Sequence, residues 1–495
     1  MAEYLVSVLA FLLRVQGLTF QSLWRDEVDS LRFASQPLGD LLQRFLAPGQ
    51  NGSLYYLLLR PWLTAAGDTE FSLRFFSVLA GTLAVPLVYH LGRRLDPSSP
   101  SVGLAASLLT AVSPYLVWYS QEARMYAAVV TLVLGAFLCL LSGLERGRWP
   151  SWLGYALLTG SSIYFHFLAV FMVPVDWVAI FILRRRNLSG SIRRYLAVLG
   201  CLAVLYTPLA IWQIPQVLHP DTGGYEFVPL SQVLASLAIT YSSGVVLGPP
   251  WSLMPLLVLV CAAITRTKRD QSRPVGVLAV WLLLPVLALF LVTLVKPLYT
   301  ARYLAYVLPA FLLLAGFGVR SLARRRFSVW LAGFLTAAIV ASSLLSVRLQ
   351  ATTVLKADMR SAAGFVSSFR QADERVMFLV PYARYSFQYY AHEPVADSFT
   401  SPPGASDHVF LPLVMGLSGA SWWVDGPYTN GGMSPAELDA AMVRLAGEGS
   451  AIWLVASEAS LWDARGLVQD WLEGHAIERT QVEFIGVTVS RYELR

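Results

Sequence analysis

Charge is scarce in this sequence. Only 14% of the 495 residues are Asp, Glu, Lys or Arg, whereas 56% are hydrophobic and the mean hydropathy is +0.56. Charged residues make up about 25% of a typical soluble domain, so the composition excludes an ordinary soluble protein and indicates a polytopic membrane protein. Cysteine is also rare, and all three cysteines lie in apolar runs, which excludes a disulfide framework. The six histidines show no paired spacing of the kind that zinc sites have.

Long uncharged runs predict about eleven membrane-spanning helices. Each run approaches the roughly 20 residues that a helix needs to cross the hydrocarbon core. The predicted spans are 3–20, 72–92, 102–119, 125–144, 150–165, 167–183, 194–214, 250–265, 275–295, 303–319 and 328–348. The first run lacks a basic segment before it and a small-residue cleavage site after it, so we interpret it as a retained helix. Arg14 lies deep in this helix, where it either extends to the surface or faces the interior of the bundle.

Basic residues cluster in every second connection between the predicted spans. The clusters are Arg93-Arg94, Arg146 with Arg148, Arg184 to Arg186 with Arg193-Arg194, Arg266 to Arg273 and Arg320 to Arg326. This distribution follows the positive-inside rule and predicts a cytoplasmic N-terminus, with the first loop and the C-terminal part on the outside. The net charge of +6 therefore indicates contact with the lipid bilayer and not with nucleic acid.

The sequence predicts two domains, a polytopic α-helical membrane domain over 1–348 and a soluble extracytoplasmic α/β domain over 349–495. In the membrane domain, the external loop 21–71 is expected to hold two interfacial helices, at 38–46 and 54–63. In the second domain, strand-length and helix-length segments alternate, which is typical of a largely parallel sheet. The expected strands are 376–380, 409–413, 451–456 and 484–492, and the expected helices are 383–391, one from 434, and 461–472. A capping box at Ser434 to Glu437 marks a helix start, and no glycine-rich segment indicates a nucleotide site.

Three charged clusters lie in loops that this topology places outside. They are Trp24-Arg25-Asp26-Glu27 with Asp29, Gln121-Glu122-Ala123-Arg124 with Tyr126, and Lys296 to Tyr303. Ionisable groups beside membrane segments are costly and often mark a functional site. A carboxylate acts as a general base toward a hydroxyl, whereas Arg, Lys and Tyr bind a departing phosphate. The alternative for Lys296 and Arg302 is contact with lipid head groups, and His166 is either a substrate contact or an ordinary polar residue.

These motifs resemble the GT-C class of integral membrane glycosyltransferases. The matching segments are Trp24-x-Asp26-Glu27, Ser120-Gln121-Glu122-Ala123-Arg124-Met125-Tyr126 and Lys296-Pro297-x-Tyr299-x-x-Arg302-Tyr303. They are most similar to bacterial relatives of protein O-mannosyltransferases and of the lipid A aminoarabinose transferase, over roughly 1–348. One departure is Asn51-Gly52-Ser53, which replaces a His- or Pro-rich entry before the Leu-Tyr-Tyr stretch.

The resemblance implies an inverting transferase in the bacterial plasma membrane that takes a sugar from a polyprenyl-phosphate donor and passes it to a hydroxyl acceptor outside. It implies catalytic roles for three acids, with Asp26 as the base and Glu27 and Glu122 as acidic partners. Donor phosphate contacts are expected from Arg124, Tyr126, Lys296, Tyr299 and Arg302. Further substrate contacts are expected from Trp24, Asp29, Tyr55, His166 and Tyr303.

Inversion needs a single displacement, so no covalent enzyme intermediate is expected. The default expectation is that no cofactor is required. A divalent cation is the alternative, because Asp26, Glu27, Asp29 and Glu122 offer oxygen ligands. A glycan ligase or polymerase that uses lipid diphosphates is the nearest other function. A transporter fits less well, because no inverted repeat is evident.

Overall fold

The computed structural model describes residues 1–43, 51–183, 188–218, 226–246, 251–266, 268, 271–324, 328–371, 374–379, 383–391, 410–412, 434–446, 451–458, 463 and 465–495. The chain forms two compact units. Unit 1 comprises Met1–Leu18 and Pro37–Thr353, and unit 2 comprises Thr19–Gln36 and Val354–Arg495. The segment 19–36, which carries Asp26 and Glu27, therefore groups with the C-terminal part and not with the membrane helices.

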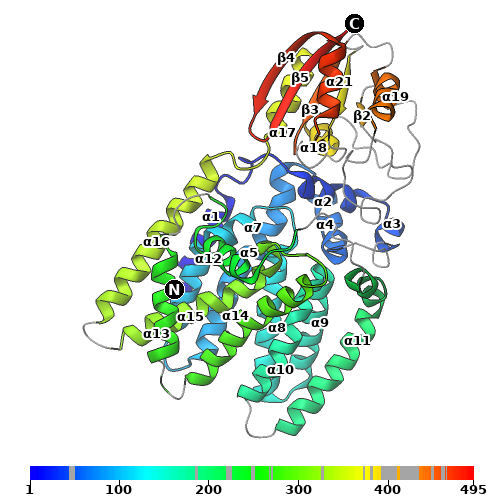
Figure 1. The fold of residues 1–495 in the computed structure, drawn as a ribbon. Helices are drawn as coiled ribbons and strands as arrows, with labels where there is room; N and C mark the ends of the chain where they lie inside the picture. The colour runs from blue at the N-terminus through cyan, green and yellow to red at the C-terminus, as the bar shows by residue number, and fades with distance from the viewer. Residues whose placement is uncertain are drawn as a thin grey trace. The chain divides into compact units, whose positions relative to one another are not determined.

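Unit 1 is helical throughout its described part (Figure 1). Its elements are α1 (Ala2–Val15), α3 (Leu38–Gln43), α4 (Ser53–Ala66), α5 (Glu70–Leu95), α6 (Ser101–Val112), α7 (Pro114–Ser120), α8 (Tyr126–Arg146), α9 (Trp149–Phe165), η1 (Phe167–Phe171), α10 (Met172–Leu183), α11 (Leu188–Leu218), α12 (Leu230–Ser243), α13 (Leu253–Arg266), α14 (Ser272–Thr293), η2 (Ala301–Val307), α15 (Leu308–Leu322) and α16 (Ser328–Thr352).

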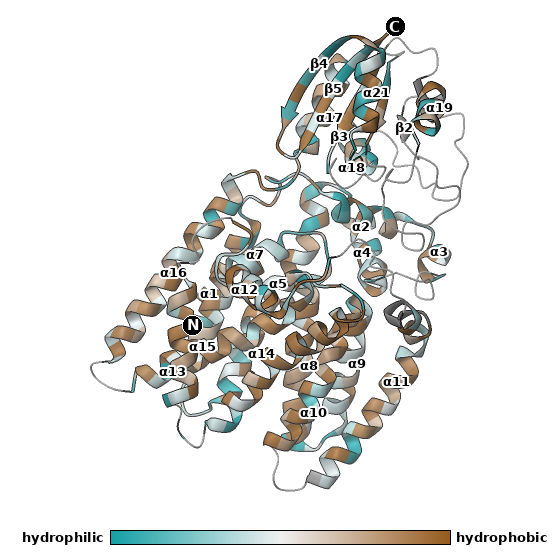
Figure 2. Ribbon diagram, in the orientation of Figure 1, coloured by the Kyte–Doolittle hydropathy of each residue, from teal (hydrophilic) through white to brown (hydrophobic). Residues whose placement is uncertain are grey.

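The protein is a polytopic membrane protein. Among the described residues, six helices are long and apolar enough to cross a membrane, and a seventh span results if α6 and α7, which meet at a bend of 58°, are counted together. Figure 2 shows the hydrophobic residues that run along α11, α14 and α16. The remaining predicted spans fall on shorter helices, such as α1 with 14 residues and α9 with 17. The count of about eleven stays a prediction.

The first loop contains the helix that was expected near 54–63, although it continues through Pro61 to Ala66. The expected end at residue 63 is three residues short, because Pro61 lies inside the helix, which packs against α5 and α9. The other expected helix is present as α3, and residues 44–46 of that expectation lie outside the described residues. Helix α12 lies in the uncharged stretch 227–265, where the sequence also allows an interfacial helix before the eighth predicted span.

Arg14 lies inside the bundle and does not extend to the surface. Its side chain is fully buried and donates hydrogen bonds to the carbonyls of Ala10 at 3.1 Å, Thr110 at 3.3 Å and Ala111 at 3.1 Å. Pro114 has no N–H to offer the carbonyl of Thr110 four residues earlier. Arg14 therefore satisfies the carbonyls that are left open where α6 breaks into α7.

Basic residues at the ends of α5, α8 and α15 gather at one end of unit 1. Arg94 forms an ion pair of 2.7 Å with Glu145, and Arg320 lies 3.5 Å from Asp96. These residues belong to the arginine clusters that define the positive-inside pattern. The loops that follow α7, α9 and α14 lie at the other ends of the antiparallel helices.

Unit 2 contains a five-stranded sheet in the order β2-β1-β3-β5-β4. The strands are β1 (Arg375–Phe378), β2 (Phe410–Pro412), β3 (Ala451–Ala456), β4 (Ala476–Phe484) and β5 (Val487–Leu494), and the helices are α2 (Arg25–Ser35), α17 (Met359–Phe369), α18 (Ala383–Tyr390), α19 (Pro435–Ala446) and α21 (Leu467–His475). Residues Ile452 to Val455 of β3 are all buried, so both faces of this strand are covered. Helices α17 and α21 pack against β4 and β5 (Figure 1).

The expectation of a largely parallel sheet is wrong. The pairs β1–β2 and β1–β3 are parallel, whereas β3–β5 and β4–β5 are antiparallel. The expected strand 484–492 is a hairpin in which Ile485 and Gly486 connect β4 to β5, and Gly486 has a φ of +68° that favours glycine. Strand β4 was not predicted as a separate strand, because most of its side chains are exposed and it therefore has no apolar run. The capping box is present, since Ser434 N donates to Glu437 Oε2 at 2.8 Å and Glu437 N to Ser434 Oγ at 3.3 Å.

Candidate active site

The loop 121–125 between α7 and α8 is held at both ends by hydrogen bonds within unit 1. Gln121 donates from its amide to the carbonyls of Arg14 at 3.1 Å and Gln16 at 2.8 Å. Ser77 on α5 donates its hydroxyl to the carbonyl of Arg124 at 3.1 Å. Glu122 is only 3% exposed in this loop. The loop therefore fixes a buried acid and an arginine two residues apart at one end of the helices.

Residues 51–56, where the sequence departs from the family pattern, connect two of the predicted site segments. Asn51 Oδ1 accepts a hydrogen bond of 3.3 Å from the backbone N–H of Phe167, next to His166. Gly52 has a φ of +85°, and a Cβ there would lie 2.9 Å from Cε of Met125. Tyr56 accepts a hydrogen bond of 3.0 Å from Arg124. This segment thus holds the loop 121–125 and the turn at 166 together.

Tyr55 is fully buried and lies behind the arginine. Its hydroxyl is 3.2 Å from Ser77 Oγ, and its ring packs edge-on against Phe76 and Phe165. Ser77 in turn donates to the carbonyl of Arg124, so Tyr55 contacts the side chain that bonds the loop 121–125.

Three segments far apart in the sequence meet at one group of side chains. We call Arg124, Tyr126, His166, Arg302 and Tyr303 the arginine–aromatic cluster. The ring of His166 lies 4.9 Å from that of Tyr303 and 5.8 Å from that of Tyr126, between ring centroids. The guanidinium carbon of Arg302 lies 5.9 Å from the centroid of each of these two tyrosines. The structure therefore brings together the second and third charged clusters and His166.

His166 is the least satisfied member of this cluster. Its side chain is 2% exposed, and neither ring nitrogen has a hydrogen-bond partner among the described residues. Burial, followed by the positive charges of Arg124 and Arg302, lowers the pKa of His166 to about 3. The imidazole is therefore neutral at physiological pH, with one N–H donor and one acceptor nitrogen.

The segment after α14 is fixed through its backbone carbonyls. Tyr115 donates to the carbonyl of Ala301 at 2.8 Å, Tyr241 to that of Leu304 at 2.7 Å, and Trp281 to that of Tyr306 at 3.1 Å. These bonds compensate for the incomplete hydrogen bonding of the 3-10 helix η2. Arg302 and Tyr303 are thereby held on a rigid support.

Two further predicted phosphate contacts, Tyr299 and Lys296, lie in the same connection. Tyr299 donates its hydroxyl to the carbonyl of Val233 on α12 at 3.2 Å, and burial raises the pKa of that hydroxyl. Lys296 is partly exposed just after the end of α14.

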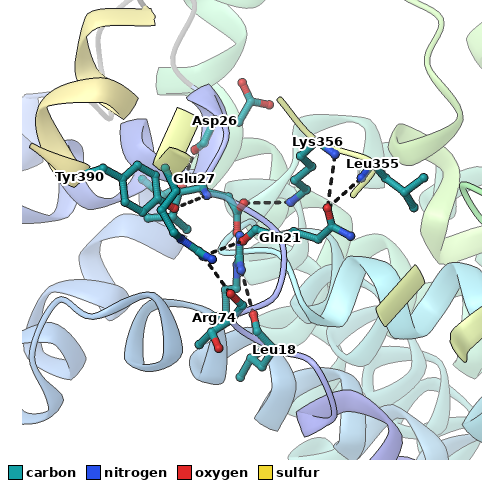
Figure 3. A network of polar contacts seen from close by, with 12 residues as sticks. Leu18, Gln21, Asp26, Glu27, Arg74, Leu355, Lys356 and Tyr390 are labelled. Carbon is teal, nitrogen blue, oxygen red and sulfur yellow. Dashed lines mark hydrogen bonds and ion pairs between the residues drawn. The ribbon is translucent and has the colours of Figure 1, made fainter. Parts of the chain in front are cut away.

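In unit 2, the two adjacent acids of the first cluster have different environments (Figure 3). Glu27 is fully buried and forms an ion pair of 2.8 Å with Lys356. Gln21 supports this lysine, because its Oε1 accepts hydrogen bonds from the backbone N–H groups of Leu355 at 3.0 Å and Lys356 at 3.3 Å. Asp26 is partly exposed, and its carboxylate points away from the Glu27–Lys356 pair in Figure 3.

Both acids lie in the first turn of α2, where negative charge is favourable. Trp24 precedes the helix, and its carbonyl accepts hydrogen bonds from the N–H groups of Glu27 at 3.0 Å and Val28 at 3.2 Å. The ring of Trp24 lies 5.7 Å from the ammonium of Lys356. Asp29 pairs with Arg32 of the same helix at 3.1 Å, and the guanidinium of Arg32 covers the ring of Tyr385 at 3.3 Å. Arg32 thus connects α2 to α18, and Asp29 pairs with it inside α2.

Several residues of these sites gave no signal in the sequence. Lys356 lies beyond the predicted membrane domain, and its pairing with Glu27 spans 329 positions. Tyr56, Ser77 and Asn51 lie in ordinary apolar or polar stretches, and only the departure from the family pattern marked Asn51. Among the described residues, no three His, Cys, Asp or Glu side chains gather in a way that would hold a metal ion.

Comparisons with known proteins agree on one class. The family model for dolichyl-phosphate-mannose-protein mannosyltransferase matches residues 53–212. The structure of ArnT from Cupriavidus metallidurans in the apo state is similar with a TM-score of 0.61 and 12% identity, over 99% of this chain and 97% of that chain. ArnT from the same organism bound to undecaprenyl phosphate gives a TM-score of 0.58 and 13% identity, over 99% and 97%. The chain has the GT-C glycosyltransferase fold.

A more distant GT-C structure is also similar. The Archaeoglobus fulgidus oligosaccharyltransferase in the apo form gives a TM-score of 0.56 and 12% identity, over 92% of this chain and 70% of that chain. No curated protein matches the sequence. The expected GT-C resemblance is thus confirmed, and at these identities the structural likeness concerns the fold.

Proposed function

We propose that this protein is an inverting glycosyltransferase that moves a sugar from a polyprenyl-phosphate donor to a hydroxyl acceptor on the external face of the membrane. The observation that carries the proposal is the arginine–aromatic cluster. Two arginines from separate segments converge there with aromatic rings, on a support of buried hydrogen bonds. Arginine suits phosphate because its planar group donates two parallel hydrogen bonds. The family match to a dolichyl-phosphate-mannose enzyme and the ArnT fold with undecaprenyl phosphate support a lipid monophosphate as the donor.

In the proposed reaction, Asp26 takes the proton of an acceptor hydroxyl as the oxygen attacks the anomeric carbon. The bond between that carbon and the phosphate oxygen breaks, and the phosphate leaves with the electron pair. Arg124 and Arg302, with Lys296 and Tyr126 as further contacts, stabilise the charge that grows on the leaving phosphate. The products are an inverted glycoside and polyprenyl phosphate. Asp26 is preferred to Glu27 because Glu27 is buried in its ion pair.

The gathering of basic residues at the opposite helix ends supports an external position for the arginine–aromatic cluster. Arg94 and Arg320 lie at those ends, where the positive-inside rule places the cytoplasm. We therefore propose that the protein is a multi-pass protein of a bacterial plasma membrane and that its active site lies on the external side. We also propose that transfer does not require a divalent cation. Measuring activity after treatment with a chelator would test this.

The proposal is tested with purified protein in detergent and radiolabelled polyprenyl-monophosphate sugars. We expect release of polyprenyl phosphate and labelled product, and no turnover of polyprenyl-diphosphate sugars. Turnover of the diphosphates alone would point to a ligase or polymerase, and equilibration of the lipid sugar across vesicles without product would point to a transporter.

Arg302→Lys gives the first specific prediction. The charge is retained but the bidentate geometry is lost, so we expect transfer to fall about 10- to 100-fold, the equivalent of one charge-assisted hydrogen bond. The control is Arg193→Lys on α11, which is exposed and should transfer at the wild-type rate. Wild-type turnover in Arg302→Lys would instead support a lipid-anchoring role for this residue.

A further inference from the structure

We infer that His166 binds a hydroxyl group of the donor sugar and thereby sets the selectivity of the protein for its glycosyl group. The inference rests on the proposed function and extends it from the phosphate to the sugar. Its basis is the position of His166 in the arginine–aromatic cluster and the absence of a partner for either ring nitrogen in the part of the chain that the structure describes.

A buried polar side chain without a hydrogen bond is rare, because it loses contact with water and gains nothing in return. The ring of His166 is stacked on Phe167 with an interplanar angle of 7°, and the N–H of Phe167 is bonded to Asn51. The imidazole is therefore held in one orientation beside Tyr126 and Tyr303. Both ring nitrogens are covered by neighbouring atoms, so a ligand would supply the missing partners after those neighbours move, while Asn51 keeps the turn at 166 in place.

The chemistry of the ligand follows from the charge state of the imidazole. Neutral histidine offers one donor and one acceptor, and a sugar hydroxyl likewise accepts and donates. A fully ionised phosphate offers acceptors only, so it would leave the acceptor nitrogen of His166 unsatisfied. Arg124 and Arg302, which together carry many N–H donors, already match the phosphate. The sugar, attached directly to that phosphate, is the part of the donor that reaches a neighbouring group such as His166.

Binding measurements on purified protein separate these roles without requiring turnover. Undecaprenyl phosphate and a series of undecaprenyl-phosphate hexoses and their monodeoxy analogues are titrated against wild type, His166→Phe and His166→Gln. Phenylalanine keeps the aromatic shape, and glutamine restores one donor and one acceptor. The thermal midpoint of each variant is recorded to establish that the protein is folded.

We expect His166→Phe to bind undecaprenyl phosphate as wild type does, but to bind the preferred sugar donor at least about fivefold more weakly, with His166→Gln in between. In wild type, one monodeoxy analogue should bind about 5- to 150-fold more weakly than the parent, because it leaves the buried imidazole unpaired. That difference should vanish in His166→Phe.

Equal weakening of undecaprenyl phosphate and of the sugar donor in His166→Phe would assign His166 to the phosphate and overturn the inference. Unchanged binding of every ligand would overturn it as well. If His166→Phe does not fold, the comparison of monodeoxy analogues between wild type and His166→Gln decides. If wild type binds no lipid-phosphate sugar at all, the proposed function itself fails, which is distinguishable from the other results.

Discussion

Removal of the ammonium group of Lys356 should release the segment that carries Asp26. Glu27 is 0% exposed and the Lys356 side chain 8% exposed, and the two charged groups are 2.8 Å apart. Removing one partner of a buried ion pair costs about 3–5 kcal/mol. Since about 1.4 kcal/mol corresponds to a factor of ten, Lys356→Met should raise the opening equilibrium of α2 about 100- to 4000-fold.

Hydrogen exchange of the amides in α2 measures this opening directly, and single-turnover transfer measures its functional effect. We expect faster exchange across α2 and a slower transfer rate in Lys356→Met. The matched control is Arg479→Met, which removes an ion pair with Glu473 whose side chains are 35% and 42% exposed. Such exposed pairs contribute about 0–1 kcal/mol, so exchange should change little.

A double variant tests the cause. In Glu27→Met with Lys356→Met, both charges are gone and an apolar contact replaces them, which is often neutral or stabilising. Exchange in α2 should return toward the wild-type rate, while the Asp26 carboxylate is untouched. Wild-type exchange in Lys356→Met alone would refute the claim that this ion pair holds the segment.

Two further predictions concern unit 1. The pKa of His166 is about 3 in the folded protein against 6.5 for the free side chain, so His166 is protonated in the unfolded chain first as the pH falls. The contribution of His166 to the free energy of unfolding should therefore be complete above about pH 6.5 and decline below it. Thermal midpoints measured across this pH range should fall less in His166→Phe than in wild type. A methyl group at Gly318 would collide with the backbone carbonyl of Leu259 where α15 crosses α13, whereas a methyl group at Gly276 would have no neighbouring atom within 4 Å. In denaturant titrations, Gly318→Ala should lower the free energy of unfolding by about 1–3 kcal/mol or more, and the control Gly276→Ala should not lower it.

Much of the membrane half could be predicted from the sequence, because its signals are local. Apolar runs marked the helices, arginine placement marked one end of the bundle, and the motifs around Arg124 and Arg302 marked two segments that the structure joins through Tyr126, His166 and Tyr303. The sequence did not predict whether Arg14 is buried, because an arginine deep in a membrane helix can either extend to the surface or face the interior of the bundle. The carbonyls of Thr110 and Ala111, which are left open where α6 breaks into α7, decide between them.

Pairings between distant segments were harder to predict. The link between Glu27 and Lys356 depends on a segment of 18 residues that groups with the C-terminal part of the chain, and no periodicity in either segment indicates it. The antiparallel half of the sheet was missed because β4 is solvated on most of its length and has no apolar run. The burial of Tyr55 and its contact with Ser77 also depend on the tertiary structure.

Single-turnover transfer by Asp26→Asn tests the central claim most directly. Wild type, Asp26→Asn, Glu27→Gln and the exposed-site control Asp470→Asn are each loaded with a radiolabelled polyprenyl-monophosphate sugar and mixed with acceptor. Loss of a general base costs about 100- to 10,000-fold in rate, so Asp26→Asn should bind donor normally and transfer it at least about 100-fold more slowly, while Asp470→Asn keeps the wild-type rate. Transfer by Asp26→Asn at nearly the wild-type rate, with Glu27→Gln folded, donor-bound and inactive, would contradict the account.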